Sequence, residues 1–164
     1  MIKEILKLGN PRLYERSEEI LPSEREDVKI WVNDLHDTLM DFRKTYGAGR
    51  AVAAPQIGVH KRLLYMYLDK PCIFINPSLT FPDDETYILW DDCMSFPGLI
   101  VKVERHKRAV IHYLDENFKP CEMSLEGGLS ELLQHEYDHL DGILATMRAV
   151  DNQSLSMEQM KRDF

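Results

Sequence analysis

The chain has 164 residues, of which 44% are hydrophobic and 29% charged, and it carries a formal net charge of −8. This length and composition predict a single globular domain over residues 1–164 and exclude an intrinsically disordered chain. The excess of acidic residues argues against direct nucleic-acid binding, because such binding depends on basic residues that neutralise phosphates.

The N-terminal segment mixes charged with apolar residues and lacks the features of a secretory signal. No apolar run approaches the ~20 residues that a membrane-spanning helix needs. We therefore expect a cytoplasmic protein without a membrane partner. The three cysteines, Cys72, Cys93 and Cys121, are too few and too scattered for a disulfide framework.

The first predicted element is a long N-terminal helix. Ser23 and Glu26 have the spacing of a capping box, and Gly47 has the residue type of a C-terminal stop. Apolar residues between them recur at helical spacing and predict a buried stripe, formed by Val28, Trp31, Leu35, Leu39 and Phe42.

Residues 60–125 contain short β-rich runs separated by turn-forming residues, which predicts largely antiparallel strands. Helical residues return from Gly127 or Gly128 to Leu140, with Gly142 as a stop. The polar tail, from about residue 150 to 164, is assigned to a marginal helix. The predicted fold class is α+β, in which short, mostly antiparallel strands surround a central metal-binding helix and a long N-terminal helix accompanies them.

The second helix carries an H-E-x-x-H motif formed by His135, Glu136 and His139. Histidines at positions i and i+4 lie on one helix face, where both can bind the same metal ion. The alternative is a solvated polar face with two histidines by coincidence. A catalytic site usually has a third protein ligand and an open position for water. No downstream residue has the spacing of a third ligand in the known metallopeptidases.

The best upstream candidate for the third ligand is Cys93, which stands among turn-forming residues in the segment WDDCMSFPG. A thiolate together with two imidazoles is a common ligand set for a divalent transition metal. The alternative for Cys93 is a small buried hydrophobic residue, which is the most common role of a free cysteine.

Three motifs in this order resemble the peptide deformylases, which remove the formyl group from the N-terminal methionine of new polypeptides. Residues 49–56 (GRAVAAPQ) resemble the family's G-x-G-x-A-A-P-Q, and residues 91–95 (DDCMS) resemble its E-G-C-L-S. Residues 134–139 (QHEYDH) match its Q-H-E-x-D-H in full. The segments ILKLGNPRL, INP and SFPG also agree, so the resemblance covers most of the chain.

The resemblance implies that Cys93, His135 and His139 hold one divalent metal ion. It favours Fe(II), with Zn(II), Ni(II) or Co(II) as alternatives. Glu136 is then expected to take a proton from the attacking water and to deliver it to the leaving amine. Asp138 either orients a ligand histidine or faces solvent.

The same resemblance assigns two donors to the formyl oxygen, the side-chain amide of Gln56 and the backbone N–H of Met94. For Gln56 the alternative is an ordinary loop residue. Gly49 and Ala51 are expected to line the substrate site, with Ala51 in place of the family's second glycine.

The second motif has Asp91 and Asp92 where the family has Glu-Gly. Asp91 is expected to pair with Arg105, and Asp92 adds a negative charge beside the metal and the substrate. Arg50 and Glu131 fall where the family's apolar methionine pocket is expected. They either bridge each other, read a charged group of the substrate, or point to solvent.

The expected function is hydrolysis of the N-formyl group from formyl-methionine peptides or nascent chains, with release of formate. Ribosome association is a further prediction. One alternative is a deformylase-like hydrolase with altered first-residue specificity, and another is a non-catalytic metal-binding homologue. A metallopeptidase is the least supported alternative, because its third ligand would lie downstream.

Overall fold

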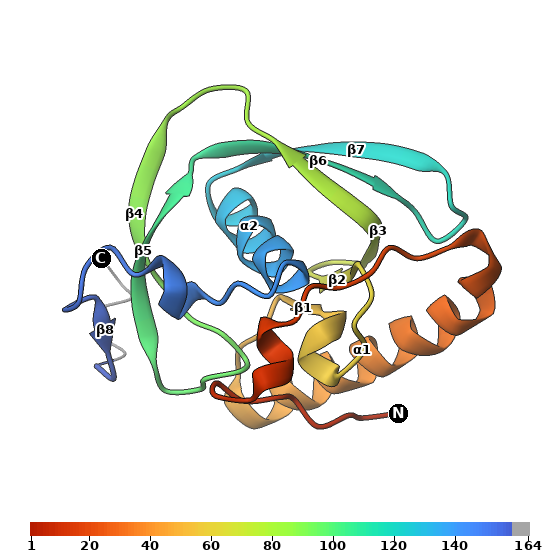
Figure 1. Cartoon of the computed structure of the whole chain (residues 1–164), viewed down its shortest axis with the longest axis horizontal. Coiled ribbons are helices and arrows are strands. Elements are labelled where there is room, and N and C mark those ends of the chain that lie inside the picture. The colour runs from red at the N-terminus through yellow and green to blue at the C-terminus, as the bar shows by residue number, and fades with distance from the viewer. Residues whose placement is uncertain (159–164) are drawn as a thin grey trace.

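The computed structural model of the chain describes residues 1–158. Helix α2 (Gly128–Leu140) lies at the centre, strands surround it, and helix α1 (Arg25–Tyr46) lies on the outside of the molecule (Figure 1). Four short 3₁₀ helices complete the described helices: Pro11–Tyr14, Pro22–Glu24, Ala54–Ile57 and Ala145–Arg148.

The strands form two antiparallel sheets, with the orders β1-β2-β3-β6-β7 and β4-β5-β8. Their bounds are Ala51–Ala53 (β1), Leu63–Tyr67 (β2), Pro71–Thr80 (β3), Thr86–Asp91 (β4), Ile100–His106 (β5), Arg108–Leu114 (β6), Pro120–Glu126 (β7) and Leu155–Ser156 (β8). The predicted fold class is confirmed. The sequence missed only β1 and β8, which are too short to show a periodic pattern.

Helix α1 buries one stripe against the sheet that contains β1 and β2. Val28, Leu35, Leu39 and Phe42 are buried as predicted, whereas Trp31 is half-buried and packs against the same core. The helix ends at Gly47, whose φ of 68° is left-handed and whose N–H donates to the carbonyl of Arg43. The predicted C-terminal stop is therefore confirmed.

The predicted capping box of α1 is wrong. Ser23 lies inside the 3₁₀ turn Pro22–Glu24, and the Glu24 carboxylate accepts a hydrogen bond from the Leu21 N–H at 2.8 Å. Glu26 instead pairs with Lys29 one turn further along α1. Pro22 fits the first position of a helical turn, which starts the turn before Ser23 is reached.

Helix α2 is held by apolar contacts with the larger sheet. Leu132, Leu133 and Leu140 share a buried cluster with Leu64 of β2 and Phe74 of β3. Burial of each such side chain contributes about 1.5–3 kcal/mol. Because its leucines pack against the sheet, the helix cannot turn about its axis. The positions of its buried polar side chains are therefore fixed.

The C-terminus of α2 ends in a Schellman motif. Gly142 has φ 71°, its N–H donates to the His139 carbonyl, and the Ile143 N–H donates to the Asp138 carbonyl. A Cβ at Gly142 would lie 2.3 Å from the backbone oxygen of Tyr14. Only glycine fits this close approach of the N-terminal segment to the end of the helix.

The predicted marginal helix of the C-terminal tail is wrong for the residues that the structure describes. Asp151 accepts hydrogen bonds from the Gln153 N–H and the Ser154 hydroxyl, which forms a turn. Leu155 and Ser156 then pair with β5 as strand β8. Residues 159–164, to which the same prediction extends, lie outside the described part of the chain. None of the described helices is long and apolar enough to cross a bilayer.

Substitution of Gly142 by alanine is expected to destabilise the protein strongly. The alanine would have to adopt a left-handed conformation, which costs about 1–2 kcal/mol, and its Cβ would also collide with the Tyr14 backbone. Gly47→Ala is the matched control, because its φ is similar but no atom lies within 4 Å of the place that its Cβ would occupy. Urea unfolding should show a clearly larger loss for Gly142→Ala. Equal losses for the two variants would contradict the close-approach argument.

Candidate metal centre and substrate pocket

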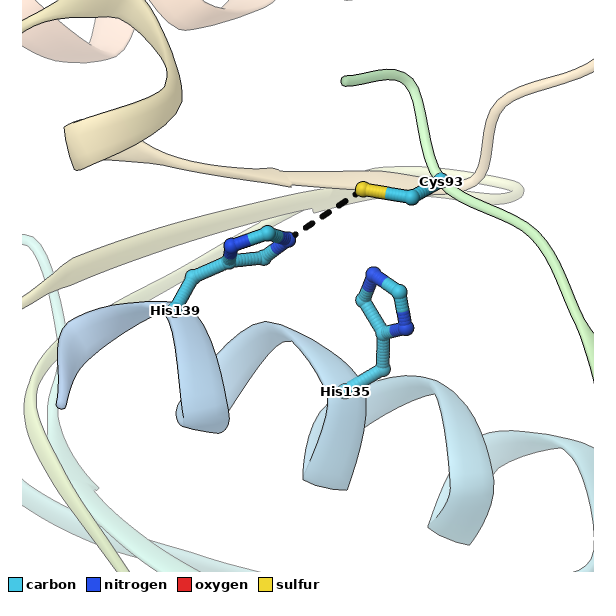
Figure 2. A group of neighbouring side chains, drawn as sticks. All are labelled: Cys93, His135 and His139. Atoms are coloured by element: carbon cyan, nitrogen blue, oxygen red, sulfur yellow. Dashed lines mark hydrogen bonds between the residues drawn. The ribbon is translucent and has the colours of Figure 1, made fainter. Parts of the chain in front are cut away.

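Cys93, His135 and His139 come together as the sequence predicts. Their candidate ligand atoms lie within 4.8 Å of one another, and all three side chains are buried. The histidines project from successive turns of α2, and Cys93 reaches them from the segment that follows β4 (Figure 2). The helix supplies one side of the cluster and the loop supplies the other.

The donor set fits a divalent transition metal. Cys93 Sγ and His139 Nε2 are 3.4 Å apart, close to the about 3.6 Å that tetrahedral coordination by sulfur and nitrogen would give. The Gln56 amide and the Ser95 N–H also lie 3.5 and 3.4 Å from the sulfur, which suits a thiolate as hydrogen-bond acceptor. The cluster therefore matches in both residue type and spacing.

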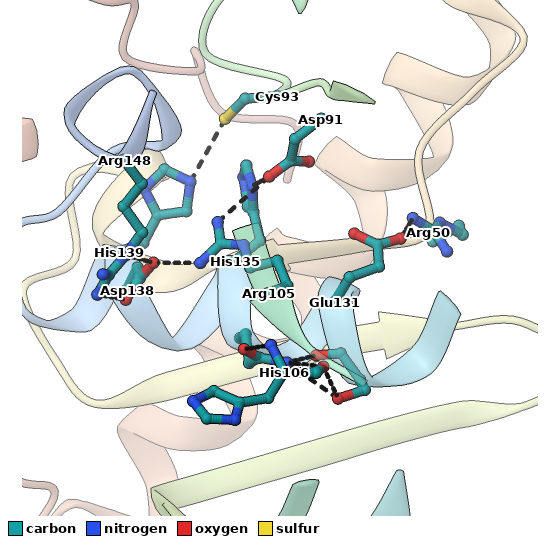
Figure 3. Close-up of polar contacts among 12 residues, drawn as sticks. Arg50, Asp91, Cys93, Arg105, His106, Glu131, His135, Asp138, His139 and Arg148 are labelled. Atoms are coloured by element: carbon teal, nitrogen blue, oxygen red, sulfur yellow. Dashed lines mark hydrogen bonds and ion pairs between the residues drawn. The ribbon is translucent and has the colours of Figure 1, made fainter. Parts of the chain in front are cut away.

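A buried chain of ionic hydrogen bonds supports His135 from behind (Figure 3). His135 Nδ1 lies 2.7 Å from the Asp91 carboxylate, to which Arg105 also donates at 3.2 Å. Arg105 reaches Asp138 at 2.6 Å, and Arg148 donates to the same carboxylate. The predicted pair of Asp91 and Arg105 is confirmed. Asp91 thereby leaves the Nε2 atom of His135 for a metal ion.

Both expectations for Asp138 are wrong. Its carboxylate is buried, contacts no ligand histidine, and is bound by the guanidinium groups of Arg105 and Arg148. Asp91 performs the histidine-orienting role that was one of the two alternatives for Asp138. No local sequence signal points to Arg148, because its place in the network depends on the turn that follows α2.

Electrostatic surroundings distinguish the two histidines. Burial would lower the pKa of His135, but Asp91 and Cys93 together raise it well above its ordinary value. Burial and the neighbouring His135 hold the pKa of His139 well below its ordinary value. The negative potential of Asp91 therefore acts more strongly on His135 than on His139.

Glu136 lies beside the cluster and lines the same pocket as Cys93 and His135. Its side chain is buried, its Oε2 atom has no hydrogen-bond partner, and burial raises its pKa to about 7. A carboxyl group in this condition can hold or release a proton near neutral pH.

Gln56 and Met94 lie next to the cysteine. The Gln56 side chain is buried, its Oε1 accepts from the Ala53 N–H, and its amide nitrogen donates toward Cys93 and Ser95. Among the described residues, no group accepts a hydrogen bond from the Met94 N–H. Met94 itself lines the pocket. Gln56 is therefore more than the ordinary loop residue of the alternative interpretation.

The pocket beside the cluster has a volume of about 340 Å³. All five residues that the sequence assigns to substrate binding line it, namely Gly49, Arg50, Ala51, Asp92 and Glu131. Gly49 has φ 127°, and a Cβ there would come within 3.3 Å of Leu39 and Phe42. The sequence missed the contribution of Phe42 and Tyr46 from the end of α1.

Arg43 fixes the edge of this pocket. Its guanidinium donates to the carbonyl of Gly49 at 2.5 Å and to the carbonyl of Tyr67. Helix α1 and strand β2 are thereby joined to the segment that enters β1. Arg50 and Glu131 adopt the first of their expected arrangements, with Nη2 of Arg50 2.6 Å from Oε1 of Glu131.

The chain matches the family profile of polypeptide deformylases over residues 2–154. It is 39% identical to peptide deformylase 1 of Prochlorococcus marinus over 167 residues, with 93% of this chain and 83% of the relative covered. The crystal structure of peptide deformylase from Thermotoga maritima is similar with a TM-score of 0.84 and 30% identity, covering 92% of this chain and 99% of the other.

A peptide deformylase from Synechococcus elongatus in complex with actinonin is also similar, with a TM-score of 0.84 and 26% identity. The match covers 99% of this chain and 86% of the other. The family profile spans nearly the whole chain, and the fold agrees with these solved structures. The chain therefore belongs to the peptide deformylase family, which consists of metal-dependent hydrolases that remove N-formyl groups from peptides.

Proposed function

We propose that the protein removes the formyl group from N-formylated peptides or nascent chains at the cluster of Cys93, His135 and His139. The observation that carries the proposal is the buried Glu136 carboxyl, which lines one pocket together with Cys93 and His135 of this cluster. The reaction would take place in the cytoplasm, where nascent chains are made. Association with the ribosome stays a prediction.

We infer that Cys93, His135 and His139 are the metal ligands. Fe(II) is the proposed ion, with Zn(II), Ni(II) and Co(II) as substitutes, because one thiolate and two imidazoles suit all four. When bound, such a cation makes a water molecule acidic enough to act as a nucleophile near neutral pH.

Glu136 is the proposed proton carrier. Its carboxylate takes the proton of the attacking water, and the resulting carboxylic acid gives a proton to the amine nitrogen as the C–N bond breaks. Burial raises the pKa of this carboxyl, which favours a group that first takes a proton and then gives one.

Gln56 and Met94 are the proposed donors to the formyl oxygen. Negative charge develops on this oxygen when the carbonyl carbon becomes tetrahedral, and a fixed donor at such a position is worth about 3–4 kcal/mol. The Ala53 N–H donates to Gln56 Oε1 and holds the side chain beside Cys93. The amide nitrogen would exchange its hydrogen bond to Cys93 or Ser95 for one to the formyl oxygen.

The alternative of a non-catalytic metal-binding homologue is less well supported. Metal binding alone needs neither a buried carboxyl without a hydrogen-bond partner nor an amide directed at the ligand sulfur. The family match favours a deformylase over a metallopeptidase.

Glu136→Gln is expected to lower formate release by about 10²–10⁴-fold, because the amide cannot carry the proton. The bound metal should remain, since Glu136 is not a proposed ligand. Formate release and metal content are to be measured on protein prepared without oxygen. Glu122→Gln, on the exposed face of β7, is the control.

Formate release by Glu136→Gln within threefold of the wild type would contradict the proton-transfer role. A wild type that binds metal but releases no formate would support the non-catalytic homologue.

Cys93→Ser is expected to weaken metal binding by more than about 100-fold. Loss of a hydrogen bond that only supports a ligand costs roughly 10- to 100-fold in affinity, and loss of a ligand should cost more. A hydroxyl is a poorer ligand than a thiolate for these metals. Competition with a chelator measures the affinity. Cys72→Ser is the matched control, because Cys72 is a free cysteine of β3 outside the cluster. Equal affinities for both variants would exclude Cys93 as a ligand.

A further inference from the structure

Arg148 stands at the end of a line of alternating charges that leads to the metal-binding cluster (Figure 3). Its Nε and Nη2 atoms donate to the two carboxylate oxygens of Asp138 at 2.5 and 2.8 Å. Arg105 donates to Asp138 at 2.6 Å and to Asp91 at 3.2 Å. Asp91 in turn lies 2.7 Å from His135 Nδ1. The line therefore connects the turn after α2 with a candidate metal ligand.

The inner members of this line are shielded from water. The side chains of Asp138, Arg105 and Asp91 are 9%, 3% and 5% exposed, whereas that of Arg148 is 43% exposed. Hydrogen bonds between buried charged groups are strong, because little water competes for them. A buried group also cannot replace a lost partner by bulk water. Loss of the partner at one end is therefore passed on to the next group.

The turn that carries Arg148 is fixed on both sides. Ala149, the next residue, forms an antiparallel bridge with Val103 of β5. Ala145, at the start of the turn, packs in the apolar cluster that contains Cys93. The turn thus contacts the side of the centre that supplies the cysteine, and its guanidinium group reaches the side that supplies the histidines.

Arg105 is shared between two carboxylates, and Arg148 affects how it is shared. Asp138 accepts three hydrogen bonds, two of which come from Arg148. Without them, this buried carboxylate would keep Arg105 as its single ion-pair partner among the described residues, and poorly compensated buried charge is costly. Arg105 would then be drawn toward Asp138 and away from Asp91, with which its contact is already the longer of the two.

The orientation of the His135 imidazole depends on Asp91. The carboxylate accepts from Nδ1 and leaves Nε2 for a metal ion. If its support from Arg105 weakens, the carboxylate can turn, and the imidazole turns with it. Partners that orient a ligand histidine contribute roughly 10- to 100-fold to metal affinity. A group that acts through such a partner should contribute less than that.

We propose that Arg148 is a positioning residue that supports metal binding at His135. By holding Asp138, it leaves Arg105 to the carboxylate that orients the imidazole. The inference rests on the proposed role of His135 as a metal ligand. Arg148 does not line the substrate pocket, so its replacement changes metal affinity without removing a contact to the substrate.

The first test replaces Arg148 by methionine, which keeps much of the side-chain length but removes the charge and the donors. We expect the dissociation constant for Zn(II), measured by competition with a chelator, to rise about 3- to 10-fold, which is less than the cost of losing a direct partner of a ligand. The visible absorption of the Co(II)-loaded protein should change as well, because it reports the arrangement of the ligands around the ion.

Arg108→Met is the matched control. Arg108 also makes paired contacts with carboxylates, those of Asp83 and Glu85, and its side chain is 34% exposed. It lies on β6, outside the line of charges that reaches His135. Neither the Zn(II) affinity nor the Co(II) spectrum should change in this control, while urea unfolding of the metal-free proteins records the stability that each replacement costs.

Asp138→Asn tests the path of the effect. With the charge of Asp138 removed, Arg105 has no competing carboxylate to neutralise. Arg148→Met should therefore weaken Zn(II) binding by less than about twofold in the Asp138→Asn background, because the two sites act through one contact. Arg148→Gln keeps an N–H donor for Asp138 but not the charge. It should change the affinity in the same direction as Arg148→Met with a smaller effect on folding, so the comparison does not depend on one variant.

Equal Zn(II) affinity of the wild type, Arg148→Met and Arg148→Gln would overturn the inference and leave the proposed centre standing. An equal loss in Arg108→Met would also overturn it, because a general loss of stability would then explain both results. The same holds if Arg148→Met has its full effect in the Asp138→Asn background. Cys93→Ser is measured alongside. If it binds Zn(II) as tightly as the wild type, the proposed metal centre is itself refuted, and the inference with it.

Discussion

The carboxylate of Asp91 is the contact on which the architecture of the site depends. It accepts from His135 on α2 and from Arg105 on β5, while its own backbone ends β4 two residues before Cys93. One side chain thus ties the helix that carries two candidate ligands to the strand pair that delivers the third. Because the carboxylate is buried, its hydrogen bonds are not weakened by competing water, and loss of Arg105 would remove the permanent positive charge that pairs with it.

The position of α2 makes this contact possible. Its leucines are fixed against the larger sheet, its end is closed by the Schellman turn at Gly142, and Asp138 is bound from β5 and from the turn that contains Arg148. A helix held on all sides cannot rotate easily about its axis. His135, Glu136 and His139 are therefore presented in a constant arrangement, which is what a catalytic metal centre requires.

The two ends of the pocket differ in chemical character. At one end, the candidate ligand residues lie beside the buried Glu136 and Gln56. One helical turn away, Arg50 and Glu131 form an ion pair in the pocket wall.

Elements with strong local patterns could be predicted from the residues alone. They are the buried stripe of α1, most of the strands, and the helix that carries His135, Glu136 and His139. The sequence also predicted the candidate histidine ligands, because the spacing of His135 and His139 on α2 is a local property. It misplaced the start of α1, since the proline turn at Pro22 competes with the capping box, and it misjudged the tail, whose strand pairs with β5. Three contacts became visible only in the folded chain: Asp91 with His135, Asp138 with Arg148, and Arg50 with Glu131. Each of these contacts joins residues from different elements. A charged side chain could pair with several oppositely charged residues of the sequence, and the packing of the elements determines which one lies within hydrogen-bond distance.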